Sequence, residues 1–150
     1  MNIDDDLGPA VSDRLAYLLK RAQVELAGLH EELLAPFAIS AGELAVLLLI
    51  DTHEPESQQQ VARRLGIDRT TTVELIDGLE SKELVARRPD AADRRRNVIE
   101  LTDTGAKTLR DATRASNHAE QRLLADLTKD EAAQLRNLLS RIATSEPDRV

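Results

Sequence analysis

The stretch RRPDAADRRRNVIEL, residues 87–101, decides the fold of this chain. Five arginines fall within residues 87–96, on both sides of a turn-rich Pro-Asp-Ala-Ala-Asp segment. The short runs LVARR (84–88) and NVIEL (97–101) on either side of that segment have the composition of β-strands. The sequence therefore predicts a two-stranded hairpin that carries a cluster of cations around its turn.

Two short helices are predicted in front of this hairpin. Ser57-Gln-Gln-Gln60 has the pattern of a capping box, and it opens a helix that Gly66 ends. Asp68 is a good N-cap for a second helix. The buried side of that second helix is expected at Val73, Ile76 and Leu79. Two short helices joined by Gly-Ile-Asp are typical of a helix-turn-helix, and the hairpin completes a winged version of it.

Longer helices are predicted on both sides of this unit. Apolar residues recur every three or four positions from about Ser12 to Leu34, and Ser40–Glu43 is a second capping box before the apolar helix AVLLLID. Thr102 caps a helix predicted to run from about Asp103 to Leu127, and Thr128–Glu131 opens the last one. The outer helices are too long and too apolar to serve the small winged unit alone. Their stripes favour burial against a second copy of the chain.

The composition excludes several classes of protein. A chain of 150 residues with 41% hydrophobic and 31% charged residues is typical of one soluble globular domain. The absence of cysteine removes disulfides, thiolate metal ligands and a cysteine nucleophile. An aromatic content of 1% argues against the stacking platforms that bind single-stranded nucleic acids. No signal peptide or membrane span is visible, so we expect a cytoplasmic protein without a membrane partner.

The net charge of −7 is unevenly distributed along the chain. Residues 58–96 contain nine Lys and Arg against seven Asp and Glu, a net charge of +2, whereas the remainder has eleven against twenty, a net charge of −9. A polyanionic partner is therefore expected to bind the middle of the chain.

The sequence contains no recognisable catalytic or metal-binding constellation. The three histidines, His30, His53 and His118, are scattered and form no H-x-x-x-H pair. Nucleophile motifs such as Ser-x-x-Lys and G-x-S-x-G are absent, as is a Gly-rich phosphate loop. We therefore expect neither an enzyme nor a metal or cofactor.

The run from Ser57 to Gly105 resembles the winged-helix core of the MarR family of bacterial transcription regulators. The most specific parts of the resemblance are the wing sequence Asp93-Arg94-Arg95 and the Leu101-Thr102-Asp103-x-Gly105 that follows it. The flanking helices fit as well, so the resemblance covers essentially the whole chain.

This resemblance implies a mainly α (α+β) fold in which residues 1–150 form a single domain. The DNA-binding lobe is expected at about 40–101, and the dimerisation helices at about 11–36 and 103–145. The resemblance further implies a homodimer that binds a palindromic operator in double-stranded DNA, most often as a repressor. A small molecule, often an aromatic acid, is expected to release it.

Positions that match the family motif are expected to contact DNA. The first turn of the recognition helix provides four of them, Arg69, Thr70, Thr71 and Thr72. Arg94 and Arg95 at the wing tip are expected to enter the minor groove, while Asp93 pairs with an arginine to hold the hairpin. Expected contacts with the DNA backbone are Gln58, Arg87, Arg88 and Arg96. The plainer alternatives are helix caps for the threonines, a surface glutamine for Gln58 and a solvated face for the charge run.

Glu74 departs from the family pattern, because members often carry an arginine at this position of the recognition helix. A carboxylate is repelled by nearby phosphates. Three outcomes stay open: the side chain points away from DNA, pairs with a neighbouring arginine, or reduces affinity.

Candidate effector-binding residues lie on or just after the first long helix, which in the family lines the effector pocket. An arginine suits a carboxylate, and two aromatic side chains suit an aromatic ring. The candidates are Arg14, Tyr17, His30 and Phe37. Each also has an ordinary explanation as a core or surface residue. A different class of function, a helical protein-interaction module that does not bind DNA, is the alternative to a DNA-binding regulator.

Overall fold

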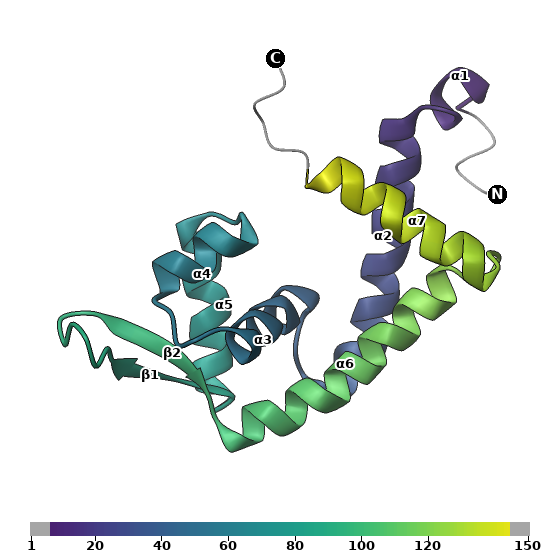
Figure 1. Ribbon diagram of the computed structural model, residues 1–150. Coiled ribbons are helices and arrows are strands. Elements are labelled where there is room, and N and C mark those ends of the chain that lie inside the picture. Colours follow the sequence, from purple (N-terminus) through teal and green to yellow (C-terminus); the bar gives the residue numbers. More distant parts are fainter. Residues whose placement is uncertain (1–6, 145–150) are drawn as a thin grey trace, which may run out of the picture.

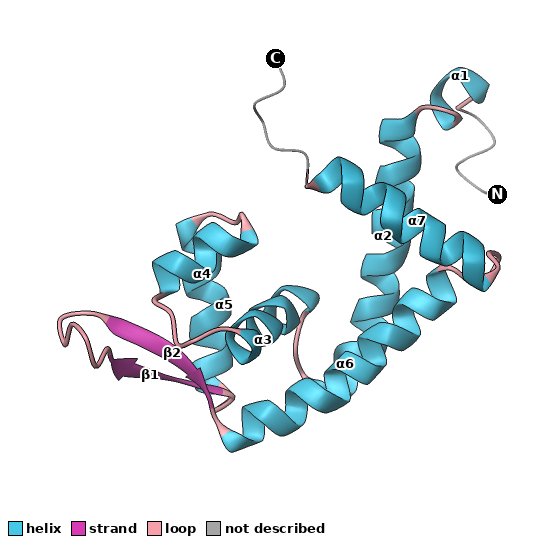
Figure 2. Ribbon diagram, in the orientation of Figure 1, coloured by secondary structure: helices cyan, strands magenta, loops and turns pink. Residues whose placement is uncertain are grey.

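A small lobe and a long helical arm make up the protein (Figure 1). The computed structural model describes residues 7–144. The lobe consists of α3 (Ala41–Thr52), α4 (Gln58–Leu65), α5 (Arg69–Ser81), β1 (Val85–Pro89) and β2 (Asn97–Leu101). The arm consists of α1 (Pro9–Ser12), α2 (Leu15–Leu34), α6 (Asp103–Leu123) and α7 (Lys129–Ala143), with the short 3-10 helix η2 (Ala35–Phe37) leading from α2 to the lobe. Figure 2 shows that the hairpin is the only sheet in this mainly helical part of the chain.

The predicted helix starts are confirmed at the level of individual hydrogen bonds. Capping boxes form at Ser40, Ser57 and Thr128, where each hydroxyl accepts from the backbone amide three residues on. Gly66 ends α4 with a φ of 64°, a left-handed conformation that glycine adopts without strain. Asp68 caps α5 as predicted. The local sequence therefore determines where these elements begin and end.

The predicted hairpin is also confirmed. β1 and β2 pair antiparallel in a register that places Val85 opposite Leu101 and Pro89 opposite Asn97. Ile99 donates its backbone N–H to the carbonyl of Glu56 at 2.9 Å, which fastens the segment before α4 to the sheet. The wing is thereby tied directly to the helix-turn-helix.

Two predicted helix boundaries are wrong. The helix expected from Ser12 to Leu34 is interrupted, because Arg14 has an extended backbone (ψ 134°) that separates α1 from α2. The helix expected to reach Leu127 ends at Leu123. Its last residues form a turn instead, in which Leu127 N–H donates to the Leu124 carbonyl at 3.0 Å and leads into the Thr128 cap.

The core fills the space between the helices of the lobe and the near end of α6. Leu47, Val61, Ile76 and Leu79 are completely buried there, and Leu109 joins them from α6. Val73, which was expected in this core, is only half-buried. Because one core includes residues of the lobe and of α6, the recognition helix is held in a fixed position relative to the arm.

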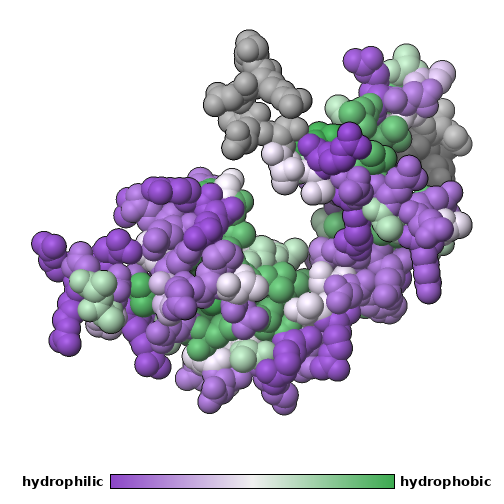
Figure 3. Space-filling model, viewed as in Figure 1, coloured by the Kyte–Doolittle hydropathy of each residue, from purple (hydrophilic) through white to green (hydrophobic). Residues whose placement is uncertain are grey.

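The outer part of the arm exposes a large apolar surface. None of the fifteen residues of α7 is buried, although its sequence is amphipathic. The exposed large apolar residues on this part of the arm are Val11, Leu15, Leu18, Leu19, Val24, Leu138, Leu139 and Ile142. Figure 3 shows apolar residues at the surface where α2 and α7 cross in Figure 1. Such a surface is expected to be covered by another chain.

No single helix within residues 7–144 has both the length and the apolar composition required to cross a membrane. The segment Leu15–Phe37 and helix α3 meet that requirement only when taken together, across a bend of 71°.

Candidate nucleic-acid interface

The N-terminus of α5 presents polar side chains to solvent. Asp68 accepts from the Thr71 amide at 2.8 Å and from the Thr71 hydroxyl at 2.6 Å, and the side-chain bond is the main reason that the pKa of Asp68 lies below its usual value. Arg69 and Thr70 are exposed and form no side-chain hydrogen bond or ion pair within the described part of the chain. The first turn of α5 therefore offers a cation and a hydroxyl to a ligand.

Thr72 does not belong to this surface, and the prediction that it contacts DNA is wrong. Its side chain is completely buried, and its hydroxyl donates to the Asp68 carbonyl at 2.8 Å. The reason is helical periodicity, since Thr72 lies one turn before Ile76 and on the same side of α5. Of the three threonines, Thr71 belongs to the cap, Thr72 to the core, and Thr70 is free to bind.

The wing tip carries the most exposed cations of the lobe. The Arg95 side chain is 91% exposed, and its Nε and backbone N–H both donate to Asp93 Oδ1, at 3.2 and 3.1 Å. This is the bracing contact predicted for Asp93. Arg94 is exposed and its side chain forms no hydrogen bond or ion pair within residues 7–144, so its guanidinium is available. The tip therefore projects two arginines, one of them oriented by an aspartate.

Arginines nearer the base of the wing are partly occupied by neighbours. Arg88 pairs with Glu100 on the adjacent strand at 2.9 Å and remains 67% exposed. Arg96 donates to Gln60 Oε1 at 3.3 Å and lies 3.7 Å from Asp90. Exposed ion pairs of this kind are weak, so both guanidinium groups are able to exchange partners with a phosphate.

Arg87 has a different environment from the other wing arginines. Its NH1 group donates to Glu80 at 2.6 Å, and its NH2 group donates to Asp77 at 2.5 Å and to Gln58 at 3.2 Å. The pKa of Arg87 is raised by its hydrogen bonds and charge interactions with Asp77 and Glu80, which outweigh its partial burial. One side chain thus joins β1, α4 and α5. This geometry favours a bracing role for Arg87 over the expected contact with the DNA backbone.

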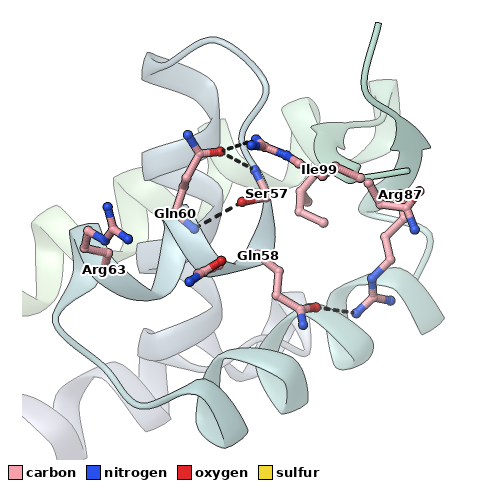
Figure 4. Close-up of a pocket in the computed structure, with 9 residues that line it drawn as sticks. Ser57, Gln58, Gln60, Arg63, Arg87 and Ile99 are labelled. Carbon is pink, nitrogen blue, oxygen red and sulfur yellow. Dashed lines mark hydrogen bonds between the residues drawn. The ribbon is translucent and has the colours of Figure 1, made fainter. Parts of the chain in front are cut away.

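Between the start of α4 and the base of the wing is an open cleft of about 430 Å³ (Figure 4). The side-chain oxygens of Gln58 and Gln60 accept hydrogen bonds from Arg87 and Arg96 respectively, which orients both amides. Arg63 lines the same cleft from α4. Because their oxygens are engaged, the two glutamines offer amide N–H donors to an anion. Sequence reasoning identified Gln58 but missed Gln60 and Arg63, whose convergence depends on the docking of the wing.

Comparison with known proteins identifies this arrangement. The family model described as MarR family matches residues 39–96, which span the helix-turn-helix and most of the wing. The transcriptional repressor CouR, solved bound to a 23-mer DNA duplex, is 34% identical and superposes with a TM-score of 0.84, covering 92% of this chain and 97% of CouR. The chain belongs to the MarR family. It is a winged helix-turn-helix transcriptional regulator that binds DNA.

Two further relatives are similar to this MarR-family chain over most of its length. CouR from Rhodococcus jostii RHA1, solved with p-coumaroyl-CoA, is 30% identical with a TM-score of 0.79, covering 95% of this chain and 99% of that one. The HTH-type transcriptional repressor NicR of Pseudomonas putida is 23% identical over 136 residues, covering 91% of this chain and 86% of NicR. These matches contradict the alternative of an interaction module that does not bind DNA.

A partly buried ion pair links the far end of the recognition helix to α3 in this MarR-family fold. Lys82 Nζ donates to both oxygens of Glu43, at 2.9 and 2.8 Å, and the Glu43 side chain is only 10% exposed. Glu43 also completes the capping box with Ser40. A Cβ on Gly78 would lie 2.7 Å from Glu43 Oε1, so the glycine makes room for the carboxylate. This pair was not predictable from local sequence patterns, because its members are 39 positions apart.

The four candidate effector residues do not form one site in this protomer. Arg14 precedes α2 and Phe37 follows it, and a helix of 20 residues separates them by about 30 Å. His30 Nε2 lies 3.0 Å from Ser116 Oγ, within hydrogen-bonding distance, and links α2 to α6. Phe37 packs against the core of the lobe, and Tyr17 is half-buried near the opposite end of α2. The prediction that they line a common pocket therefore gains no support.

A groove does occur between the lobe and the arm, at a different place. It has a volume of about 510 Å³ and lies between α3 and α6. Its lining residues are Leu48, Asp51, Ala106, Leu109, Arg110 and Thr113. Sequence reasoning missed this groove because it depends on the packing of two helices more than 50 positions apart. Within residues 7–144, no group of three or more His, Asp or Glu side chains is arranged to hold a metal ion.

Proposed function

We propose that this chain is a repressor that occupies a palindromic operator as a homodimer, and that it is not an enzyme. The first turn of α5 and the wing tip of the lobe both present exposed arginines, Arg69 on the helix and Arg94 and Arg95 on the wing. The relatives CouR and NicR are named as repressors. A regulator that binds the bacterial chromosome acts in the cytoplasm, which is the location that we propose.

The exposed arginines define how the lobe would meet duplex DNA. The first turn of a recognition helix enters the major groove, which places Arg69 and Thr70 against base edges. Arg94 and Arg95 would reach the neighbouring minor groove, where narrow A·T tracts have the most negative potential. Gln58 and Arg96 at the cleft would bind the phosphates in between. The exposed arginines at the wing tip are the observation that carries this proposal.

Replacing Arg95 by alanine should weaken binding to duplex DNA about 10-fold or more, because a charge-assisted contact is lost. The logarithm of the affinity should also depend less steeply on the logarithm of the salt concentration, by about one unit of slope for each phosphate contact removed. A DNA duplex for these measurements can be found by selecting tight binders from a library of random sequences. Fluorescence anisotropy at several salt concentrations then measures both quantities.

Arg114→Ala is the matched control, because Arg114 carries the same charge and its side chain is exposed on α6. Among residues 7–144 it pairs only with Asp111. Its affinity and salt dependence should equal those of the unmodified protein. Equal affinities for the Arg95 variant and the control would remove the wing from the interface.

The dimer would be built from the outer helices. We propose that α1, α2, α6 and α7 form the dimerisation region, and that residues 40–101 form the DNA-binding lobe. The support is the unburied apolar face of α7 together with the exposed leucines of α2. Two-fold symmetry would place one lobe on each half of a palindrome, with half-site centres one or more helical turns apart.

The effector is proposed to bind the groove between α3 and α6. This groove lies between the lobe and the arm, so a ligand there would contact both α3 and α6. It combines an apolar wall, formed by Leu48 and Leu109, with the exposed guanidinium of Arg110. An aromatic acid or its coenzyme A thioester has the matching chemistry, an apolar ring with a negative charge. The relative CouR, solved with p-coumaroyl-CoA, supports the same class of ligand.

Ligand binding should raise the melting temperature by about 5–10 °C at a ligand concentration 100 times its dissociation constant. Free p-coumaric acid and p-coumaroyl-CoA, tested separately, distinguish an acid from a thioester. Arg110→Ala should abolish the shift, whereas Arg114→Ala, one turn further along α6, should retain it. An unchanged shift in the Arg110 variant would place the effector elsewhere.

A further inference from the structure

Three carboxylates lie along the recognition helix, and they differ in whether they have an ion-pair partner. Asp77 and Glu80 are both bonded to the guanidinium of Arg87, at 2.5 and 2.6 Å. Glu74 is exposed and has no hydrogen-bond or ion-pair partner among residues 7–144. The possibility that Glu74 pairs with a neighbouring arginine is therefore excluded in this protomer.

Glu74 lies on the face of α5 that is turned away from the core. The buried residues of this helix are Thr72, Ile76 and Leu79. At about 100° per residue, Glu74 is roughly 160° around the helix from Ile76. It is also one turn beyond the exposed Thr70, and therefore on the same side. This face is the one that a winged helix inserts into the major groove.

The other carboxylates of the lobe make the isolation of Glu74 significant. Glu56 pairs with Arg64, Asp90 with Arg96, and Glu100 with Arg88. Asp93 pairs with Arg95, and Asp68 caps α5. Of the carboxylates in residues 56–101, only Glu74 and Glu83 have no side-chain partner among residues 7–144, and Glu83 follows the far end of α5. In this segment, Glu74 is therefore the one unpaired carboxylate on the exposed face of α5.

We propose that Glu74 determines operator specificity by accepting a hydrogen bond from the N4 amino group of a cytosine. An ionised carboxylate is only an acceptor, so it requires a donor on the base edge. Guanine and thymine present acceptors there, and the adenine amino group is adjacent to the N7 acceptor, whereas cytosine presents the N4 donor. This inference rests on the proposed DNA-binding function and adds the base that the helix reads.

The carboxylate would act as much by exclusion as by attraction. Opposite guanine or thymine, Glu74 would remain desolvated beside an acceptor and close to phosphates, which disfavours those sequences. A substitution that removes the charge should therefore increase binding to non-cognate duplexes while it removes discrimination at one base pair. General repulsion from phosphates would instead change the affinity for all duplexes alike.

Selection from a random duplex library, repeated with Glu74→Ala and Glu74→Gln, tests this proposal. The unmodified protein should require cytosine at one position in each half-site, preferring it over other bases about 10-fold or more. The alanine variant should lose the preference at that position alone. The glutamine variant should prefer adenine there, because a glutamine amide pairs with adenine N6 and N7.

Glu83→Gln is the control, since it removes the same charge outside the proposed interface. Its base preferences should match those of the unmodified protein, and thermal unfolding verifies that all variants are folded. A uniform rise in affinity for every duplex in both Glu74 variants, with base preferences unchanged, would overturn the role of Glu74. Failure of the unmodified protein to retain any duplex would instead contradict DNA binding itself.

Discussion

Replacing Gly105 by alanine should lower the free energy of unfolding by about 4 kcal/mol, near the upper end for single substitutions. A Cβ at this position would overlap the carbonyl oxygen of Leu84 and lie 2.9 Å from its carbonyl carbon. Neither the Leu84 carbonyl nor the backbone of Gly105 can move easily, because both are hydrogen-bonded to Thr102. The Leu84 carbonyl accepts from the Thr102 amide at 3.1 Å, and Gly105 N–H donates to the Thr102 hydroxyl at 2.9 Å.

Chemical denaturation followed by circular dichroism measures this loss. The matched control is Gly28→Ala, because Gly28 lies in the middle of α2 with nothing within 4 Å of an added Cβ. The free energy of unfolding of that control should rise by about 0.5–1 kcal/mol, because alanine is a better helix former than glycine. If the Gly105 variant instead loses less than about 1 kcal/mol, the close approach to Leu84 is not essential to the fold.

The close approach explains why the Leu-Thr-Asp-x-Gly sequence follows the wing. Besides capping α6, the Thr102 hydroxyl donates to the Glu83 carbonyl at 2.7 Å. The residues that end the recognition helix are therefore joined to the first turn of α6. The motif was recognisable in the sequence, but its physical reason appears only when Leu84, just before β1, is seen against Gly105 of α6.

Local features of the fold were predictable because they depend on residues within a few positions of one another. Each capping box links residues three apart, and the hairpin needs only a turn between two strand-prone runs. The bracing of Arg95 by Asp93 is equally local. Such interactions form whatever the rest of the chain does, so the sequence is sufficient to predict them.

The errors concern interactions between distant residues. Thr72 was assigned to the DNA-facing surface because it lies in the first turn of α5, but the phase of α5 against the core is set by Ile76 and Leu79. Arg87 was grouped with the other wing arginines, although docking of β1 against α5 brings it between two carboxylates. The groove that we propose for the effector is formed by two helices other than the one that carries the candidates chosen from the sequence. Predicting any of these requires knowing how the helices pack.

Replacing Ile142 by glutamate should separate the dimer and reduce operator binding about 1,000-fold, to the level of non-specific binding. Ile142 is 67% exposed in the protomer, although it lies on the same face of α7 as Leu135 and Leu138. Burying an ionised carboxylate in an apolar interface costs several kcal/mol, and two-fold symmetry imposes that cost twice. Each freed protomer would then hold only one half of the operator.

Sedimentation equilibrium measures the association, and anisotropy with the selected operator measures the binding. Asn137→Glu introduces the same side chain about 140° around α7 from Ile142 and should leave the association and the operator binding unchanged. Because Ile142 packs so little within the protomer, its replacement should not unfold the lobe. A dimer that persists in the Ile142 variant would show that α7 lies outside the interface, and its apolar face would then need another partner.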